Sequence, residues 1–366
     1  DDVDIATTLM PDQVSAALTK ANLRAVPTGV EHGTVTAVSQ SQPFEITTLR
    51  RDVSTDGRRA VVAFTTDWRE DALRRDFRFN TLYADARGEV FDATGEGVAD
   101  AKAGRVVFVG DAQTRIREDY LRILRLFRFH AWYGRTAPDP TALEACKAFK
   151  DGMSLLSAER VAKELLKTLT ARDPREALSL MVQIGVMTEV LPEARDLARL
   201  NGLVEIELTQ FWPPDAELRL ASMMPDASIA STTARRLRLS TAQHDRIVAA
   251  VQTEPSIELE MAPRAARRAI YAAGAQAFAD RVKLAWAGER STILAPHWLG
   301  LLAIGKAWTR PILPVRGEDA AAAGLAKGPL IGQALNAVEA WWIEADFPED
   351  RQSALEKLRS VARDLA

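Results

Sequence analysis

The sequence has little of the chemistry that staples or anchors a chain. Its 366 residues include one cysteine, Cys146, and four histidines. A lone cysteine cannot form an internal disulfide, which excludes a disulfide-stapled domain and is typical of a reducing compartment. No apolar run approaches the roughly 20 residues that a membrane-spanning helix needs. The acidic first residues also lack the basic and then apolar pattern of a signal peptide. We therefore expect a cytoplasmic protein without a membrane partner.

The sequence also lacks a strong net charge. Lysine and arginine number 47 against 50 aspartates and glutamates, a formal charge of −3, whereas nucleic-acid-binding proteins usually carry a basic excess. An apolar fraction of 47% and a charged fraction of 27% exclude a disordered or fibrous chain. At roughly 100–200 residues per domain, the length predicts two or three domains.

Two patterns divide the chain near Gly110. Before it, short alternating runs between turn residues predict strands at 34–38, 43–49, 60–64 and 105–110 and in TLYAD and EVFDATG. After it, the apolar spacing is helical almost to the end. The predicted fold class is α+β, a small mixed sheet followed by an elongated all-helical part. We divide it into a head (1–110), a neck (111–170), a body (171–255) and a tail (256–366).

The chain begins with two aspartates that lie two positions apart. On a strand, such side chains share a face, so Asp2 and Asp4 would converge while Val3 and Ile5 turn into the core. Converging carboxylates repel unless a cation lies between them, and oxygen ligands without His or Cys favour Mg²⁺. Glu45, on a neighbouring predicted strand, could present a third carboxylate. The alternatives are cap or strand-end aspartates and a solvated glutamate.

A second candidate site lies in the helical pattern after Gly110. On one helix, Asp119 and Arg122 would be i, i+3 neighbours opposite an apolar stripe of Ile116, Tyr120, Ile123 and Phe127. Arginine only donates hydrogen bonds and aspartate only accepts them, so the pair matches the base edges of C and A and opposes those of U and G. The alternative is an exposed ion pair worth a few tenths of a kcal/mol.

A third motif, Arg74–Asn80, lies between these two. Arginine is suited to a triphosphate as a forked donor, and the amide of Asn80 can bond a ribose hydroxyl through either end. The alternative is a sheet-to-helix connection with solvated charges.

In this order the motifs resemble those of the class II tRNA nucleotidyltransferases, the bacterial CCA-adding enzymes. The similarity covers nearly the whole chain and rests on DVDIATTLMP, PTGVEHGTVT, FEITTLR, DGRRAVVAF, RRDFRFNTLY, REDYLRILRLFRFHAWYG and LSAERVAKELLKTL. The resemblance implies that Asp2 and Asp4 hold the catalytic Mg²⁺ ions. From the strand pattern, we predict Glu45 as a third, catalytic carboxylate. The resemblance implies further that DGRRAVVAF is a flexible loop and that Glu159 and Arg160 brace the site. The nucleotide-binding residues would be Arg75, Asp76, Asn80, Asp119, Arg122 and Arg125.

The resemblance also implies a reaction. An enzyme of this family adds C, C and A to the 3′ end of tRNA from CTP and ATP by two-metal nucleotidyl transfer and releases pyrophosphate. The helical remainder would grip the tRNA, and we expect no obligate protein partner. The related poly(A) polymerases usually carry a Gly-Arg-Arg-Phe-type stretch after the aspartates, whereas this chain has Pro27-Thr28-Gly29. A poly(A) polymerase and a non-catalytic RNA-binding relative remain the alternatives.

The sequence departs from the family pattern at two places. A Gly-Gly-x-Val-Arg-Asp segment normally precedes the Asp pair, so we expect that the sequence lacks its first few dozen residues. Arg78 and Thr81 stand where the family usually has Thr and Ala, beside the expected ribose contact. His244-Asp245 is similar to a metal phosphohydrolase dipeptide, but four histidines are too few for that site, and we expect His244 on a helix surface.

Overall fold

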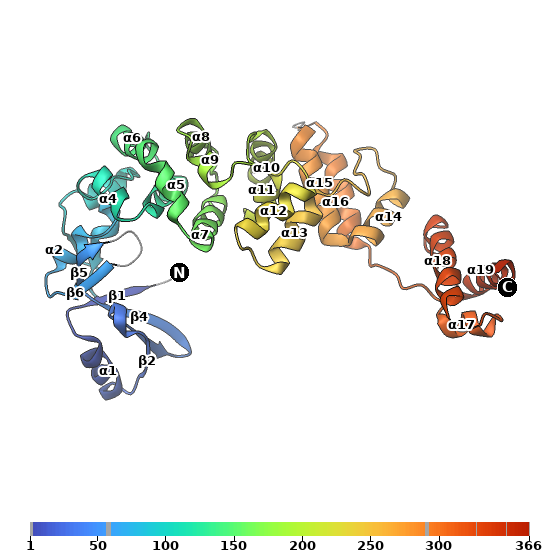
Figure 1. Cartoon of the computed structure of the whole chain (residues 1–366), viewed down its shortest axis with the longest axis horizontal. Helices are drawn as coiled ribbons and strands as arrows, with labels where there is room; N and C mark the ends of the chain where they lie inside the picture. Colours follow the sequence, from blue (N-terminus) through green and yellow to red (C-terminus); the bar gives the residue numbers. More distant parts are fainter. Residues whose placement is uncertain (1–2, 56–59, 290–292, 327, 349, 366) are drawn as a thin grey trace. The chain divides into compact units, whose positions relative to one another are not determined.

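The computed structural model describes residues 3–55, 60–289, 293–326, 328–348 and 350–365, and side chains are described outside 52–62. It contains two compact units, and Figure 1 labels their helices and strands. The first comprises Asp1–Arg195, Pro213–Ala216 and Arg236–Leu239, and the second Asp196–Trp212, Glu217–Arg235 and Ser240–Ala366. The four-part division into head, neck, body and tail stays a prediction.

All the strands of the described residues belong to the first unit. They are β1 (Asp4–Thr7), β2 (Arg24–Gly29), β3 (Thr34–Ser39), β4 (Gln42–Thr48), β5 (Arg50–Thr55), β6 (Ala60–Phe64), β7 (Leu82–Ala84) and β8 (Val90–Asp92). Its helices are α1 (Pro11–Lys20), α2 (Trp68–Leu73), α3 (Gly97–Ala103), α4 (Ala112–Glu118), α5 (Leu121–Tyr133), α6 (Pro140–Phe149), α7 (Ala158–Leu169), α8 (Arg175–Gln183) and α9 (Val186–Val190).

The rest of the chain is helical. Its helices are α10 (Ala198–Thr209), α11 (Ala216–Ser222), α12 (Ala227–Arg236), α13 (Thr241–Val251), α14 (Pro263–Ala273), α15 (Ala275–Glu289), α16 (Ala295–Ala307), α17 (Gly317–Ala322), α18 (Pro329–Glu344) and α19 (Arg351–Leu365). A small mixed sheet followed by helices confirms the predicted α+β class. No helix in the described ranges is long and apolar enough to cross a membrane.

The four-stranded sheet has one apolar and one polar face. Its strand order is β1-β4-β3-β2, with β1 parallel to β4 and the other pairs antiparallel. Side chains alternate between faces along each strand. The apolar face packs against α1 (Figure 1) through a cluster of Val14, Leu18, Val35, Ala37, Phe44 and Ile46. The opposite face carries polar side chains, which include Thr34, Thr36, Glu45 and Thr47.

Two strand predictions need correction. Residues 105–110 form no strand, because their pairing is limited to one isolated bridge between Phe77 and Phe108. Val3 and Ile5 are 56% and 40% exposed rather than buried in the core. The reason is that β1 is an edge strand, and α1 packs over β2, β3 and β4. The strands predicted at 34–38, 43–49 and 60–64 and in TLYAD and EVFDATG are confirmed.

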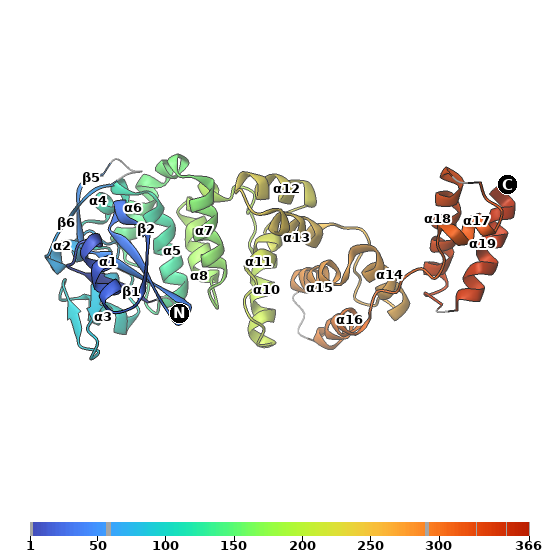
Figure 2. The same ribbon diagram turned by 90° about the horizontal axis from the view of Figure 1, so that it is seen from below.

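The second unit has its own cores. In one, Arg219 is fully buried and donates to the carboxylate of Glu207 at 2.7 Å. Another lies among α17, α18 and α19 (Figure 2) and contains Val315, Ala320, Leu325, Ala334, Val338, Ala354, Leu358 and Ala362. A cluster of Tyr271, Trp342 and Phe347 joins α14 to the end of α18.

Candidate active site

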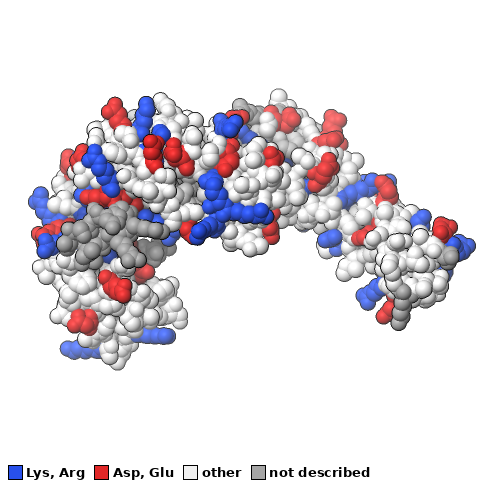
Figure 3. Space-filling model, in the orientation of Figure 1, with Lys and Arg blue, Asp and Glu red and all other residues white. Residues whose placement is uncertain are grey.

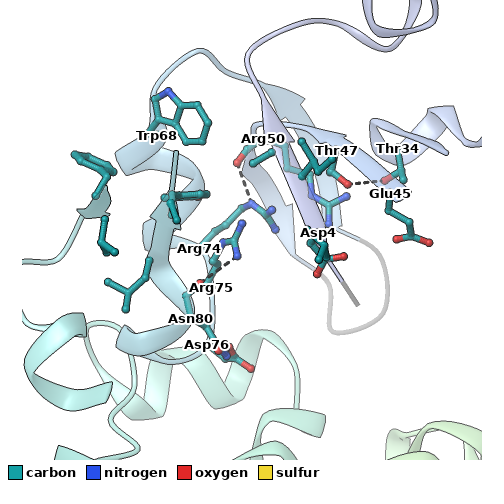
Figure 4. Close-up of a pocket in the computed structure, with 18 of the residues that line it drawn as sticks. Asp4, Thr34, Glu45, Thr47, Arg50, Trp68, Arg74, Arg75, Asp76 and Asn80 are labelled. Atoms are coloured by element: carbon teal, nitrogen blue, oxygen red, sulfur yellow. Dashed lines mark hydrogen bonds between the residues drawn. The ribbon is translucent and has the colours of Figure 1, made fainter. Parts of the chain in front are cut away.

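A cleft of about 1670 Å³ opens in the first unit. All of its lining residues lie between Val3 and Arg160. The polar face of the sheet forms one side, and the segment Arg74–Asn80 approaches from another (Figure 4). Residues of α5, of α7 and of the β7–β8 hairpin also line it.

Two carboxylates meet on the sheet side of this cleft. Asp4 on β1 and Glu45 on β4 are register partners in the parallel pair, so their side chains share one face (Figure 4). Both are exposed to the cleft. Among the described residues, neither carboxylate has a hydrogen-bond or ion-pair partner. The expectation that a neighbouring strand brings Glu45 beside the aspartate pair is confirmed for Asp4, while Asp2 lies outside the described residues.

These carboxylates fit a divalent cation. Like charges in adjacent register positions repel unless a cation neutralises them, and hard oxygen donors suit Mg²⁺, which keeps water and phosphate as further ligands. In the described part of the chain, no group of three or more His, Cys, Asp or Glu side chains could hold a metal. Asp4 and Glu45 are the two carboxylates that share the polar sheet face of the cleft.

A buried aspartate that the sequence analysis missed organises the opposite side of the cleft. Asp71 on α2 is 2% exposed and accepts hydrogen bonds from Arg74 (2.8 Å), Arg75 (3.1 Å), the Tyr83 hydroxyl (2.6 Å) and the Arg50 amide (3.1 Å). Burial raises its pKa, but the Tyr83 hydrogen bond and the Arg74 guanidinium outweigh burial and hold the pKa below its usual value. The available signal was its i, i+4 spacing to Arg75.

Asp76 has a similar role one turn later. Its buried carboxylate accepts from Arg125 of α5 at 2.5 Å and from the Asn80 amide at 2.8 Å. Burial raises the pKa of Asp76, whereas the Arg125 guanidinium and the Asn80 amide lower it, with a net decrease. Asp76 thus joins two predicted nucleotide-binding residues, and Arg75, Asp76, Asn80 and Arg125 all line the cleft.

The predicted helix containing Asp119 and Arg122 is wrong in one respect. The helix breaks at Asp119, whose φ of −157° and ψ of 107° are extended, so α4 ends before it and α5 begins at Leu121. Asp119 accepts from Arg160 of α7 at 2.6 Å, while Arg122 bonds Glu118 and the Arg115 carbonyl. The two side chains form no ion pair with each other, yet both line the cleft.

The remaining motifs lie elsewhere. Arg78 turns to α3, where it pairs with Glu96 at 2.8 Å, and it is not among the lining residues. Of the predicted flexible loop DGRRAVVAF, residues 56–59 lie outside the described residues. His244 on α13 is bonded by the Ser231 hydroxyl and its neighbour Asp245.

Comparison with known proteins agrees with this architecture. Residues 1–107 match the poly A polymerase head domain, and residues 137–197 match the probable RNA and SrmB-binding site of polymerase A. A mitochondrial CCA tRNA nucleotidyltransferase 1 of Mus musculus is 33% identical over 98% of this chain and 82% of its own length. This chain belongs to the CCA tRNA nucleotidyltransferase family. The family predicted from the motifs is thereby confirmed.

Other family members show the same extent of similarity. The Homo sapiens mitochondrial enzyme is 32% identical over 98% of this chain and 82% of its own length. Among solved structures, the CCA-adding enzyme of Bacillus stearothermophilus, determined in complex with CTP, has a TM-score of 0.77. It is 23% identical, over 100% of this chain and 90% of that structure, and so supports the fold alone.

Proposed function

We propose that this protein adds C, C and A to the 3′ end of tRNA from CTP and ATP and releases pyrophosphate. The observation that carries the proposal is the register pairing of Asp4 with Glu45 on the polar sheet face. That pair opens into a cleft whose other residues suit a nucleotide. In the reaction, the tRNA 3′ oxygen bonds to the α-phosphorus as the bond from that phosphorus to the bridging oxygen breaks. Pyrophosphate leaves with the electron pair, and the 3′ hydroxyl proton passes to solvent.

Asp4 and Glu45, together with Asp2, would hold the divalent metal, for which we propose Mg²⁺. When bound, the metal supplies positive charge beside the transferred phosphate and the attacking oxygen. Arg75 is the proposed hydrogen-bond donor to the nucleotide phosphates, because Asp71 and the Asn80 carbonyl hold its guanidinium at the cleft.

Choice between nucleotides is assigned to Asp119 and Arg122. Each already has a carboxylate or guanidinium partner: Arg160 donates to Asp119, and Arg122 donates to Glu118. An incoming C or A would therefore exchange hydrogen bonds with these side chains rather than meet bare charges, which lowers the desolvation cost of binding. Arg125 and Asn80, both tied to Asp76, would lie against the base and ribose.

The test is incorporation of each labelled nucleotide into tRNA that lacks its 3′ end, with Mg²⁺ present. We expect C, then C, then A, with addition stopping after the third nucleotide. Asp4→Asn should lower the rate by at least about 100-fold, the typical effect of removing one electrostatic contribution to the transition state. Asp12→Asn, on the exposed side of α1, is the matched control.

Other outcomes would contradict the proposal. An unlimited A tail would identify a poly(A) polymerase, and tRNA binding without incorporation would identify a non-catalytic relative. A cytoplasmic location stays a prediction from the sequence, since the Mus musculus and Homo sapiens relatives are named as mitochondrial.

A further inference from the structure

Helices α5 and α7 carry exposed aromatic and basic side chains beyond the cleft. At the end of α5, Trp132 and Tyr133 are 48% and 54% exposed, one turn after the cleft residue Phe129. On α7, two exposed lysines follow the cleft residue Arg160 on the same helix face, three and seven positions later. We call this set the α5–α7 strip: Trp132, Tyr133, Arg160, Lys163 and Lys167.

Contacts between the two helices fix the rings of the strip. The indole Nε1 of Trp132 donates to the Lys167 carbonyl at 2.7 Å, although the ring is about half exposed. Tyr133 stacks on Phe129 with ring centroids 6.0 Å apart. The helices themselves lie side by side (Figures 1 and 2). These rings are therefore held in place before any ligand arrives, which reduces the entropy cost of binding.

The two lysines of the strip supply positive charge beside the cleft. Among the described residues, neither Lys163 nor Lys167 has a carboxylate within ion-pair distance. The nearby acids on α7 are already engaged: Glu159 pairs with Arg238 at 2.7 Å, and Glu164 with Arg128 at 2.5 Å. An anion that approaches the strip therefore meets two unpaired ammonium groups.

We propose that the α5–α7 strip binds the single-stranded 3′ end of the RNA primer and leads it to the cleft. Bases and riboses stack on Trp132 and Tyr133, and phosphates pair with Lys163 and Lys167. Fixed aromatic rings next to unpaired basic groups are the combination that recognises single-stranded nucleic acid without sequence preference. A strip continuous with the cleft through Phe129 and Arg160 fits a primer whose terminal nucleotide must reach Asp4 and Glu45. The inference rests on the proposed function.

The test compares Lys163→Ala/Lys167→Ala with Lys102→Ala/Lys147→Ala, which removes the same charge from exposed positions on α3 and α6. Incorporation of C is measured first with varied tRNA at saturating CTP, and then with varied CTP at saturating tRNA. In the strip variant, we expect the KM for tRNA to rise about tenfold and the KM for CTP to stay unchanged. The slope of log affinity for tRNA against log salt should fall by roughly 1.4, since each phosphate contact to a single strand contributes about 0.7.

A second pair of variants tests stacking. Trp132→Ala should raise the KM for tRNA roughly 5- to 100-fold, the range for loss of one base–aromatic stack. Trp132→Phe loses the hydrogen bond to Lys167 but keeps an aromatic ring. Because the ring can still stack, this variant should keep most of the wild-type affinity for tRNA. Failure of the phenylalanine variant to rescue would mean that the indole acts as a structural tie.

The outcomes separate this inference from the proposed function. If the wild-type protein incorporates nucleotides and the strip variants keep its KM for tRNA, the proposed RNA-binding role of the strip is wrong while the proposed function stands. An equal rise in the KM for tRNA in the control variant would have the same meaning. Wild-type protein that incorporates no nucleotide would contradict the proposed function. In that case, the same variants are compared by fluorescence anisotropy with a labelled single-stranded RNA, where an unchanged Kd overturns the strip.

Discussion

A single buried side chain, Asp71, holds three donors of the cleft in place. Its oxygens accept from Arg74, Arg75 and Tyr83, each of which lines the cleft. Asp71→Asn keeps the shape but removes the charge. We expect the KM for CTP to rise because Arg75 loses its anchor. We also expect the free energy of unfolding to fall by about 1–3 kcal/mol, the cost of unsatisfied buried polar groups. CTP titration and urea unfolding measure the two effects, and Asp12→Asn is the control.

The same variant has a defined pH dependence. The folded pKa of Asp71 lies below the usual value for an aspartate, so below about pH 4 the unfolded chain binds more protons than the folded one. The stabilisation is present above the unfolded pKa and disappears as the pH falls through the folded pKa. The stability difference between wild type and Asp71→Asn should therefore be constant near neutral pH and shrink below about pH 4. A difference that grows on acidification would contradict this account.

At the scale of elements, the break between α4 and α5 is what directs Asp119 into the cleft. The next residue, Tyr120, lies over Gly152 in the 3₁₀ segment Lys150–Leu155, where a Cβ atom would overlap its ring. Gly152→Ala should therefore displace Tyr120 and, with it, Asp119. We expect misincorporation of U and G to rise in Gly152→Ala, as we also expect for Asp119→Ala, with little change in the KM for tRNA.

Gly300→Ala is the control for Gly152→Ala. Gly300 lies in α16 and faces open space, so a methyl group there meets no neighbour. Alanine is also the better helix former, by about 1 kcal/mol. Unchanged nucleotide choice in both Asp119→Ala and Gly152→Ala would show that the break has no part in selection.

The sequence predicted one site element well and another poorly, for physical reasons. Alternation along each strand predicted that Glu45 could lie beside the aspartates, because the side-chain period of a strand is fixed at two. The register that makes Asp4 and Glu45 partners comes from the structure. The helix break at Asp119 could not be seen in the same way. It is accompanied by a long-range hydrogen bond from Arg160, and local apolar spacing contains no information about that partner. The burial expected for Val3 and Ile5 failed similarly, since exposure depends on which strands α1 covers.

On the scale of the whole molecule, 47 basic and 50 acidic side chains nearly cancel. On the face in Figure 3, acidic and basic side chains are interspersed over a surface that is largely neither. Within the cleft, by contrast, the basic groups have identified hydrogen-bond partners. In the α5–α7 strip, Lys163 has no carboxylate within ion-pair distance among the described residues. A net charge of −3 is therefore compatible with an RNA substrate, because affinity depends on the local phosphate contacts.

The position of the cleft residues in the chain gives a prediction for the whole molecule. Every residue that lines the cleft precedes position 161, whereas α17, α18 and α19 have a separate core. A chain that ends after Arg310 should keep its KM for CTP, measured with a saturating acceptor RNA. Its KM for full-length tRNA should rise if the tail contributes to tRNA binding. A changed KM for CTP would contradict the independence of the cleft.

The parallel pairing of β1 with β4 also has a consequence for how activity arises. Strands β3 and β4 are joined by the two-residue turn Gln40-Ser41, so this hairpin can form from local contacts alone. Strand β1 must then close a long loop to dock beside β4, a slower kind of step. Asp4 arrives only with that docking. We therefore expect a refolding chain to pair β3 with β4 before Asp4 reaches its register position beside Glu45.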